Sequence, residues 1–351
     1  MYDYIIITHL PSFYKINLYN ELAKKIKILV IYIASGSSIR TKDFTDNKMD
    51  FDYMYLNKGD FETRNKMISV LKLLLIIKNK NFKNVIVGGW DLPEFWLAVL
   101  FTKKQKNCLA LESTVFESDL SVLKSLIKKL FLARVAIIFA SGSMHKELAE
   151  ALDFKGKIFI TKGVGIINYV PLEIDKKNKV SKKVNKLLYI GRLSREKNLI
   201  RLIEALNGLP NINLTIVGTG PQKEELERLA KDNISFLGHI ENKKLQEVFY
   251  DNDVFVLPSL SETWGLVIDE AIYFGLPILA SKRVGSVEEL VILPSTGLTF
   301  NPYNINDIQD KILEIIELDN YNMFKQNVLY YDIAAKDKEQ VSIYIQESDN
   351  A

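Results

Sequence analysis

Two carboxylates in the second half of the chain, Glu262 and Glu270, have the residue type and spacing of a site for sugar hydroxyls. Glu262 follows an apolar run that ends at Pro258–Ser259, and seven residues separate it from Glu270. A helix is predicted to begin near Thr263–Gly265, and its first turn would offer free N–H groups and a positive dipole end to an anion. A nucleotide sugar needs this layout, because it has hydroxyls at both ends and a diphosphate between them. Alternatively, both glutamates are helix-capping or surface charges.

Basic residues follow a second apolar run, which ends at Ile190. Gly191 permits close approach of a ligand to the backbone, and Arg192 and Lys197 lie in the turn before an amphipathic helix. Their positive charges would neutralise a diphosphate and stabilise it as a leaving group. Alternatively, these residues lie in a solvated turn, and we interpret the neighbouring Arg195 in that way.

Two shorter segments also follow apolar runs. Gly218 and Gly220 resemble a glycine-rich phosphate loop without its third glycine, so they form either a structural turn or a wall of the donor site. His239 and Ile240 could contact a base through their backbone, or they could be ordinary loop residues.

Thirteen short, β-branched apolar runs alternate with longer amphipathic segments. Continuous apolar strands separated by helices indicate parallel sheets covered on both faces. The sequence therefore predicts an α/β protein with two doubly wound, Rossmann-like domains that face each other across a cleft, with ligands beyond the carboxyl ends of the strands. The runs are residues 2–8, 26–34, 51–56, 84–89, 108–113, 135–141 and 157–161 in the first half, and 186–191, 213–218, 234–238, 253–259, 277–281 and 297–300 in the second.

A lysine-rich stretch without apolar periodicity predicts the domain boundary. We expect an acceptor-side domain over residues 1–174, a linker over 175–186 and a nucleotide-sugar-binding domain over 187–335. Residues 336–351 are a tail that could return to the first domain.

Composition and charge exclude several classes of protein. The 351 residues include one cysteine and three scattered histidines, which argues against a disulfide framework or a zinc cluster. The amino terminus lacks the features of a signal peptide and no apolar run approaches the ~20 residues of a membrane span, so we expect a cytoplasmic protein. Residues 1–170 contain 25 Lys and Arg against 16 Asp and Glu, whereas residues 171–351 contain 21 against 27.

Five ordered segments between residues 186 and 302 resemble the family 4 glycosyltransferases of the GT-B fold. They read YIGRLSREKN, IVGTGP, FLGHI, VLPSLSETWGLVIDEA and GLPILAS. The resemblance implies a UDP- or GDP-linked sugar donor, transfer with retention of anomeric configuration, and no cofactor or essential metal. Consistent with this, Asp251–Asn252–Asp253, which spells a metal-binding Asp-x-Asp, is predicted to lie at the wrong end of its strand.

The resemblance also implies roles for individual residues. Those with catalytic roles are Arg192 and Lys197, on the diphosphate, and Glu262, near the donor sugar. Glu270 would hold the ribose hydroxyls. The remaining donor-site residues are the phosphate-facing backbone of Thr263, Trp264 and Gly265, together with Leu266, Gly191, Gly218, Gly220, His239 and Ile240.

The first half resembles the family more weakly. Many members have a histidine after the fifth strand, and here Glu112 or Ser113 stands in its place. Gly89 and Trp90 follow another strand, where they form either a plain turn or part of the acceptor side.

Residues 120–134 form a basic amphipathic stretch. They predict either a helix that covers a sheet or a peripheral docking site on an anionic membrane at the inner face of the cell membrane. No nucleic-acid-binding motif is present.

These features predict a hexosyltransferase that uses UDP- more readily than GDP-sugars and acts on a lipid-linked or polysaccharide glycan, as in O-antigen assembly. The alternatives are a nucleotide-sugar 2-epimerase or another GT-B enzyme, and a non-catalytic subunit of a polysaccharide assembly complex.

Overall fold

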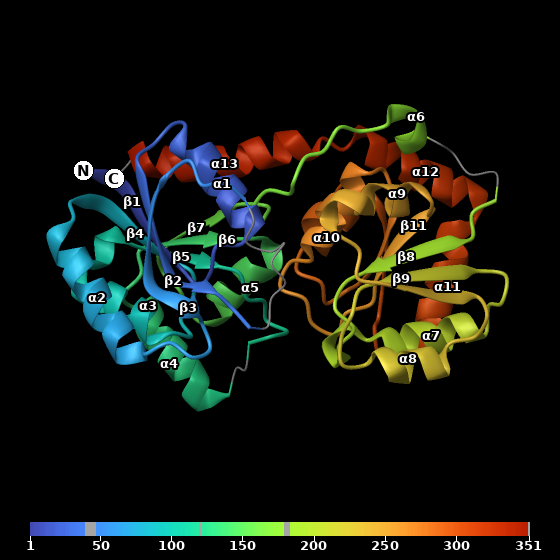
Figure 1. Ribbon diagram of the computed structural model, residues 1–351, viewed down its shortest axis with the longest axis horizontal. Coiled ribbons are helices and arrows are strands. Elements are labelled where there is room, and N and C mark those ends of the chain that lie inside the picture. The colour runs from blue at the N-terminus through green and yellow to red at the C-terminus, as the bar shows by residue number, and fades with distance from the viewer. Residues whose placement is uncertain (39–46, 119–120, 179–182, 350–351) are drawn as a thin grey trace. The chain divides into compact units, whose positions relative to one another are not determined.

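The computed structural model describes residues 1–38, 47–118, 121–178 and 183–349. The chain divides into two compact units. The first unit contains Met1–Asn168 and Ala334–Ala351, and the second contains Tyr169–Ile333. Figure 1 shows the helices and strands of each unit.

The first unit is built on a parallel sheet that has seven strands within the described ranges, in the order β3-β2-β1-β4-β5-β6-β7. All seven apolar runs predicted in this half form strands. The strands are β1 (Tyr2–Thr8), β2 (Ile28–Gly36), β3 (Asp52–Asp60), β4 (Phe82–Val87), β5 (Asn107–Leu111), β6 (Ile137–Ala140) and β7 (Lys157–Ile160).

Helices cover both faces of this sheet because its strands are apolar on both sides. Ile5 and Ile7 of β1 pack with residues of α2, α3 and α4, whereas Tyr4 and Ile6 pack with residues of α1 and α13. The helices are α1 (Phe13–Ala23), α2 (Lys66–Asn79), α3 (Pro93–Phe101), α4 (Val122–Leu132), α5 (Ser143–Ala151) and, from the end of the chain, α13 (Ile333–Asp349).

The second unit is built on a parallel sheet in the order β10-β9-β8-β11-β12-β13. Its strands match the predicted apolar runs, so the predicted fold class is confirmed. They are β8 (Lys186–Ile190), β9 (Asn213–Val217), β10 (Ile234–Gly238), β11 (Val254–Leu257), β12 (Ile278–Ser281) and β13 (Gly297–Phe300). The helices are α6 (Ile174–Lys177), α7 (Leu199–Asn207), α8 (Lys223–Leu229), α9 (Leu245–Tyr250), α10 (Leu266–Tyr273), α11 (Ile305–Ile316) and α12 (Leu318–Tyr330).

The units divide at two points in the chain. The first lies a few residues before the predicted 175–186 linker. Two hydrogen bonds hold the residues in between to the second unit: Tyr273 donates to the carbonyl of Val170 (2.6 Å), and Tyr250 accepts from the N–H of Glu173 (3.0 Å). Linker residues 179–182 lie outside the described residues. Beyond the second division point, the ring of Tyr344 in α13 packs against the ring of Phe139 in the first unit, with 4.4 Å between the ring centroids.

Both sheets reverse their strand order at one point. In the first sheet the reversal lies between β1 and β4, and in the second it lies between β8 and β11. Connections leave such neighbouring strands in opposite directions, which opens a crevice at their carboxyl ends where ligands bind in open α/β sheets. Ligand-binding residues are therefore expected directly after these four strands.

No helix among the described residues is both long and apolar enough to cross a bilayer.

Candidate functional site

An ion pair between Lys197 and Glu262 lies at the strand-order reversal of the second sheet. Lys197 belongs to a short 3-10 helix, Arg195–Lys197, that follows β8, and Glu262 lies in the loop after β11. Both side chains are less than one-fifth exposed. The backbone of Glu262 is held on both sides, since its carbonyl accepts from Gly285 (2.9 Å) and its N–H donates to Arg283 (3.3 Å). Two residues 65 positions apart in the chain are thus held together.

Asn198 connects the loops that carry this pair. It has a left-handed backbone (φ 59°), and its side-chain amide donates to the carbonyls of Pro258 (3.1 Å) and Pro302 (2.8 Å). Sequence reasoning did not identify Asn198 as a site residue. The available signal was its residue type, because asparagine adopts this conformation more readily than other residues with a side chain.

The predicted glycines allow the loops after β8 and β9 to pack against each other. A side chain at Gly218 would place its Cβ 1.9 Å from the carbonyl oxygen of Gly191, and one at Gly220 would place it 2.3 Å from that of Leu193. These contacts support the structural-turn interpretation of Gly218 and Gly220. Arg192 follows directly and is exposed, and its carbonyl accepts from the Tyr189 hydroxyl (2.9 Å).

The helix that follows Glu262 begins at Leu266, with Gly265 as a left-handed N-cap (φ 86°) that offers no side-chain cap. A Cβ at Gly265 would lie 3.4 Å from Cγ of Glu262, so this helix start lies beside the ion pair. Trp264 is buried and its indole N–H donates to Asp269 (2.9 Å). Its side chain therefore belongs to the core, and only its backbone could contact a ligand, as expected. Thr263 is exposed.

Glu270 lies on the same helix, α10, and its side chain, unlike that of Glu262, has no hydrogen-bond or ion-pair partner among the described residues. It is half-buried. Burial, with a smaller contribution from the neighbouring Asp269 charge, raises the pKa of Glu270 to about 7. A desolvated carboxylate without a protein partner is typical of a ligand-binding position.

His239 and Ile240 follow β10, which is separated from β11 by β9 and β8. His239 is exposed and Ile240 is half-buried. Like the ion pair, they lie at the carboxyl ends of the strands of this sheet.

Asp253 of the Asp-x-Asp sequence has a structural role. Its carboxylate accepts from the backbone N–H groups of Asn185 and Lys186 (both 3.0 Å), at the amino end of β8. This is the opposite end of the sheet from Glu262. Among the described residues, no group of three or more His, Cys, Asp or Glu side chains could hold a metal ion.

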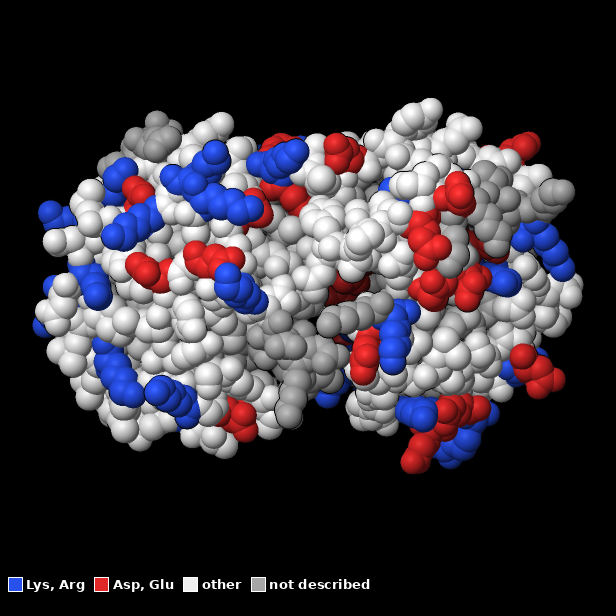
Figure 2. Space-filling model, turned by 45° about the horizontal axis from the view of Figure 1, so that its top comes forward, with Lys and Arg blue, Asp and Glu red and all other residues white. Residues whose placement is uncertain are grey.

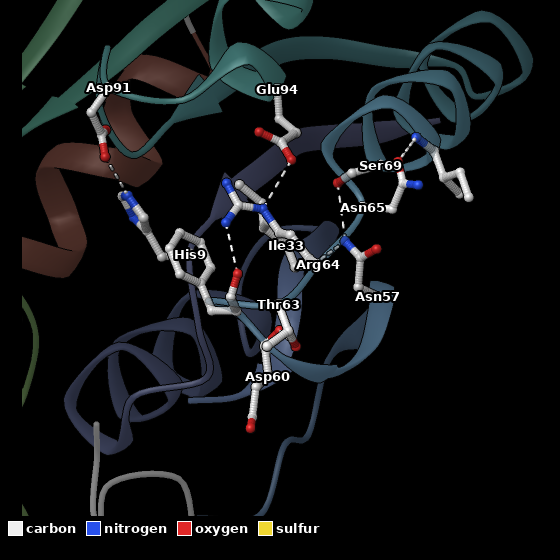
Figure 3. Close-up of polar contacts among 12 residues, drawn as sticks. His9, Ile33, Asn57, Asp60, Thr63, Arg64, Asn65, Ser69, Asp91 and Glu94 are labelled. Carbon is white, nitrogen blue, oxygen red and sulfur yellow. Dashed lines mark hydrogen bonds and ion pairs between the residues drawn. The ribbon is translucent and has the colours of Figure 1, made fainter. Parts of the chain in front are cut away.

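A second polar pair lies at the strand-order reversal of the first sheet. His9 directly follows β1, Asp91 lies in the loop after β4, and Nε2 of His9 is 3.1 Å from Oδ2 of Asp91 (Figure 3). Burial alone would raise the pKa of Asp91, but the hydrogen bond from His9, a backbone hydrogen bond and the charge of Arg64 hold it below its ordinary value. Sequence reasoning missed this pair, because 82 residues separate its members.

Arg64, which follows β3, forms a buried ion pair with Glu94 of α3 (3.3 Å). Its guanidinium also donates to the carbonyl of Phe61 (2.8 Å) and lies over that ring. Figure 3 shows the Arg64–Glu94 pair and, beside it in this view, the His9–Asp91 pair.

The predicted acceptor-side residues have local partners. Glu112, directly after β5, forms an ion pair with the buried Lys15 (2.8 Å). Burial would lower the pKa of Lys15, but the Glu112 charge raises it above its ordinary value. Ser113 is half-buried beside Glu112. A Cβ at Gly89 would lie 2.6 Å from Oδ1 of Asp91, so Gly89 lets the carboxylate approach the loop.

Trp90 lies between Gly89 and Asp91 and is half-buried. Its carbonyl accepts from the Trp96 indole (2.9 Å), and the Lys128 ammonium lies 5.6 Å from the centre of its ring. Gly89 and Trp90 thus belong to the loop that carries Asp91.

Residues 172–328 match the family model described as glycosyl transferases group 1. The match covers most of the second unit. Among curated proteins, the sulfoquinovosyl transferase SQD2 of Arabidopsis thaliana is 34% identical over 37% of this chain and 26% of its own length. The first relatives found are matched over only about a quarter to a half of their own length.

Solved structures share the fold over nearly the whole chain. Sucrose-phosphate synthase from Thermosynechococcus elongatus has a TM-score of 0.75 at 17% identity and covers 99% of this chain and 100% of its own. Anabaena HepE in complex with UDP and glucose has a TM-score of 0.71 at 14% identity, with 98% and 99% covered. These similarities show that the chain has the GT-B fold.

Proposed function

We propose that this protein is a retaining, metal-independent glycosyltransferase. It moves a hexose-type sugar from a nucleotide sugar, UDP-linked rather than GDP-linked, to a hydroxyl of a lipid-linked or polysaccharide glycan. Glu270 is the observation that carries the proposal: a half-buried carboxylate without a partner in the described chain, on the helix that starts beside the Lys197–Glu262 pair. The family match of residues 172–328 and the UDP complex of HepE support it.

Glu270 has the properties that a ribose-binding residue needs. A partly buried carboxylate without hydrogen bonds is unfavourable, and two ribose hydroxyls would replace the water that it has lost. On this assignment the nucleoside lies along α10, and its diphosphate reaches the amino terminus of that helix. The free N–H groups around Gly265 then contact phosphate oxygens.

Arg192 and Lys197 stabilise the leaving group. The bond between the sugar C1 and the diphosphate oxygen breaks, the acceptor oxygen bonds to C1 on the same face, and the acceptor proton passes to the diphosphate. Negative charge therefore grows on the diphosphate in the transition state, and two positive charges there lower the barrier. Glu262 orients the sugar while its ion pair with Lys197 keeps the ammonium in place.

The first unit binds the acceptor in this proposal. Its exposed apolar side chains support a membrane-associated acceptor, because α4 exposes Val122, Leu123 and Leu130 beside several lysines. We place a peripheral membrane contact at this helix.

A two-step experiment tests the function. UDP- and GDP-sugars are first screened for thermal stabilisation of the protein, and we expect a UDP-sugar to give the largest rise. The stabilising sugar is then incubated with the enzyme, with and without a panel of glycan acceptors. Transfer only in the presence of an acceptor supports the proposal. Conversion of the donor alone would indicate an epimerase, and the lack of any nucleotide binding would indicate a non-catalytic subunit.

A further inference from the structure

We infer that His9 and Asp91 form a subsite for an uncharged, hydroxyl-bearing sugar of the acceptor. In this subsite Nδ1 of His9 accepts a hydrogen bond from an acceptor hydroxyl. The inference rests on the proposed function and adds a recognition residue to it. Its basis is the pair at the strand-order reversal of the first sheet, where a ligand crevice is expected on topology alone.

The Asp91 contact fixes the protonation pattern of the His9 ring. A carboxylate only accepts hydrogen bonds, so Nε2 of His9 carries the hydrogen that it donates to Oδ2 of Asp91. In the neutral ring Nδ1 then has a free lone pair. Nδ1 has no hydrogen-bond partner within the described residues, and about one-third of the side chain is exposed.

The ring is also held in one orientation. Phe95 packs edge-on against it at 5.1 Å between centroids, and Phe61 lies at 5.8 Å. The carbonyl of His9 accepts from Ala34 of β2 (3.2 Å). A fixed ring loses little entropy when it binds a ligand, which is what a recognition residue requires.

The local charges favour an uncharged ligand. Asp91 carries a negative charge because its pKa lies below the ordinary value, although burial opposes this. Arg64, whose positive charge acts on Asp91, is engaged by Glu94 and by the Phe61 carbonyl. Asp91, Arg64 and Glu94 together carry one net negative charge, which would repel a phosphate or carboxylate. The matching ligand is therefore a neutral sugar hydroxyl.

The test uses the full chain with the donor sugar found above and two sets of acceptors, neutral p-nitrophenyl glycosides and glycosyl phosphates. His9→Ala, His9→Asn and Asp91→Asn are compared with Glu150→Gln, which changes an exposed, ion-paired carboxylate on α5 of the same unit. Donor affinity by calorimetry and the thermal midpoint of each variant establish that it is folded.

We expect His9→Ala to raise the KM for the neutral glycoside about tenfold, because one hydrogen bond to the acceptor is lost. The change in kcat should be smaller. His9→Asn should recover part of the loss, because its amide can lie near the position of Nδ1. Asp91→Asn should resemble His9→Ala, while Glu150→Gln and all donor affinities should stay unchanged.

Two results would overturn the inference while leaving the proposed function intact. One is an unchanged KM in His9→Ala, or a large fall in kcat with no change in KM. The other is a wild-type enzyme that uses glycosyl phosphates and no neutral glycoside. Absence of donor binding by the wild-type protein would instead remove the proposed function itself.

Discussion

Glu262 and Glu270 both belong to the proposed donor site, but their environments differ. Glu262 has a cationic partner in Lys197, and its backbone is fixed by two hydrogen bonds. Glu270 has no side-chain partner among the described residues and a pKa of about 7. Glu270 therefore carries an energetic cost in the ligand-free protein, which a bound ribose would relieve.

The raised pKa of Glu270 predicts that the stability of the protein depends on pH. Since the pKa of Glu270 lies above its unfolded value, the folded state holds the proton more tightly, and stability falls as pH rises from about 4.5 to 7. Glu270→Gln removes the charge. We expect it to raise the free energy of unfolding at pH 8 by about 1 to 3 kcal/mol and to have little effect at pH 4.5. Urea denaturation at the two pH values measures both effects.

The control for this prediction is Glu204→Gln, which removes an exposed charge from α7 of the same unit. It should change stability little at either pH. A Glu270→Gln protein that gains nothing at pH 8, or gains equally at both pH values, would show that Glu270 is not destabilised by burial.

The residues of the proposed donor site could be selected from the sequence, whereas the His9–Asp91 pair could not. Glu262 and Glu270 lie close together in the chain, and the glycines and basic residues around them follow strands in a recognisable order. His9 and Asp91 become neighbours only because β1 pairs with β4. Apolar runs predict strands but do not state which strands pair, so the sequence contained no signal for this contact.

At the scale of elements, the exposure of α4 bears on both interpretations of residues 120–134. Residue 120 lies outside the described residues. Leu123, Ile127, Leu130 and Phe131 recur at helical spacing, so they lie on one face of α4. The structure buries Phe131 and leaves Leu123 69% and Leu130 58% exposed. Only the last turn covers the sheet, so most of the apolar face is open for another partner.

This exposed face makes a prediction about vesicle binding. Replacing Lys124, Lys128 and Lys129 with glutamine should weaken binding to vesicles rich in anionic lipid by roughly a hundredfold at low salt, at ~1 kcal/mol for each lysine. Co-sedimentation over a range of salt concentrations measures this. Binding of the wild-type protein should fall as salt rises, because the attraction is screened.

A matched control replaces three exposed lysines of the second unit, Lys223, Lys231 and Lys244, with glutamine. It makes the same change in net charge away from α4. Equal losses in both triple variants would indicate a general charge effect, and salt-independent binding would contradict the proposed contact.

For the whole molecule, the uneven charge distribution gains an interpretation. Figure 2 shows that basic side chains are more frequent over the first unit and acidic ones over the second. The anionic donor is nevertheless assigned to the acidic half, because Arg192, Lys197 and the start of α10 supply positive potential locally. Net charge alone would point to the wrong half of the chain.

Within the described residues all thirteen strands could be predicted, because most of them are buried, continuous apolar runs of distinct length and composition. The boundary between the units was less accessible. The lysine-rich stretch suggested residue 175, but the structure divides the chain at Asn168–Tyr169. Tyrosine hydroxyls hold the intervening residues to the second unit, and such single hydrogen bonds leave no pattern in composition.

Calorimetric titration of UDP into the wild-type chain, Glu270→Ala, Arg192→Ala and Glu204→Ala tests the central claim most directly. The donor-site assignment predicts that UDP binds the wild-type protein and Glu204→Ala equally. It also predicts that Glu270→Ala and Arg192→Ala each lose at least about tenfold in affinity, since each removes a charged hydrogen-bonding group worth about 1.5 to 3 kcal/mol. Unchanged affinity in both of these variants would contradict the account.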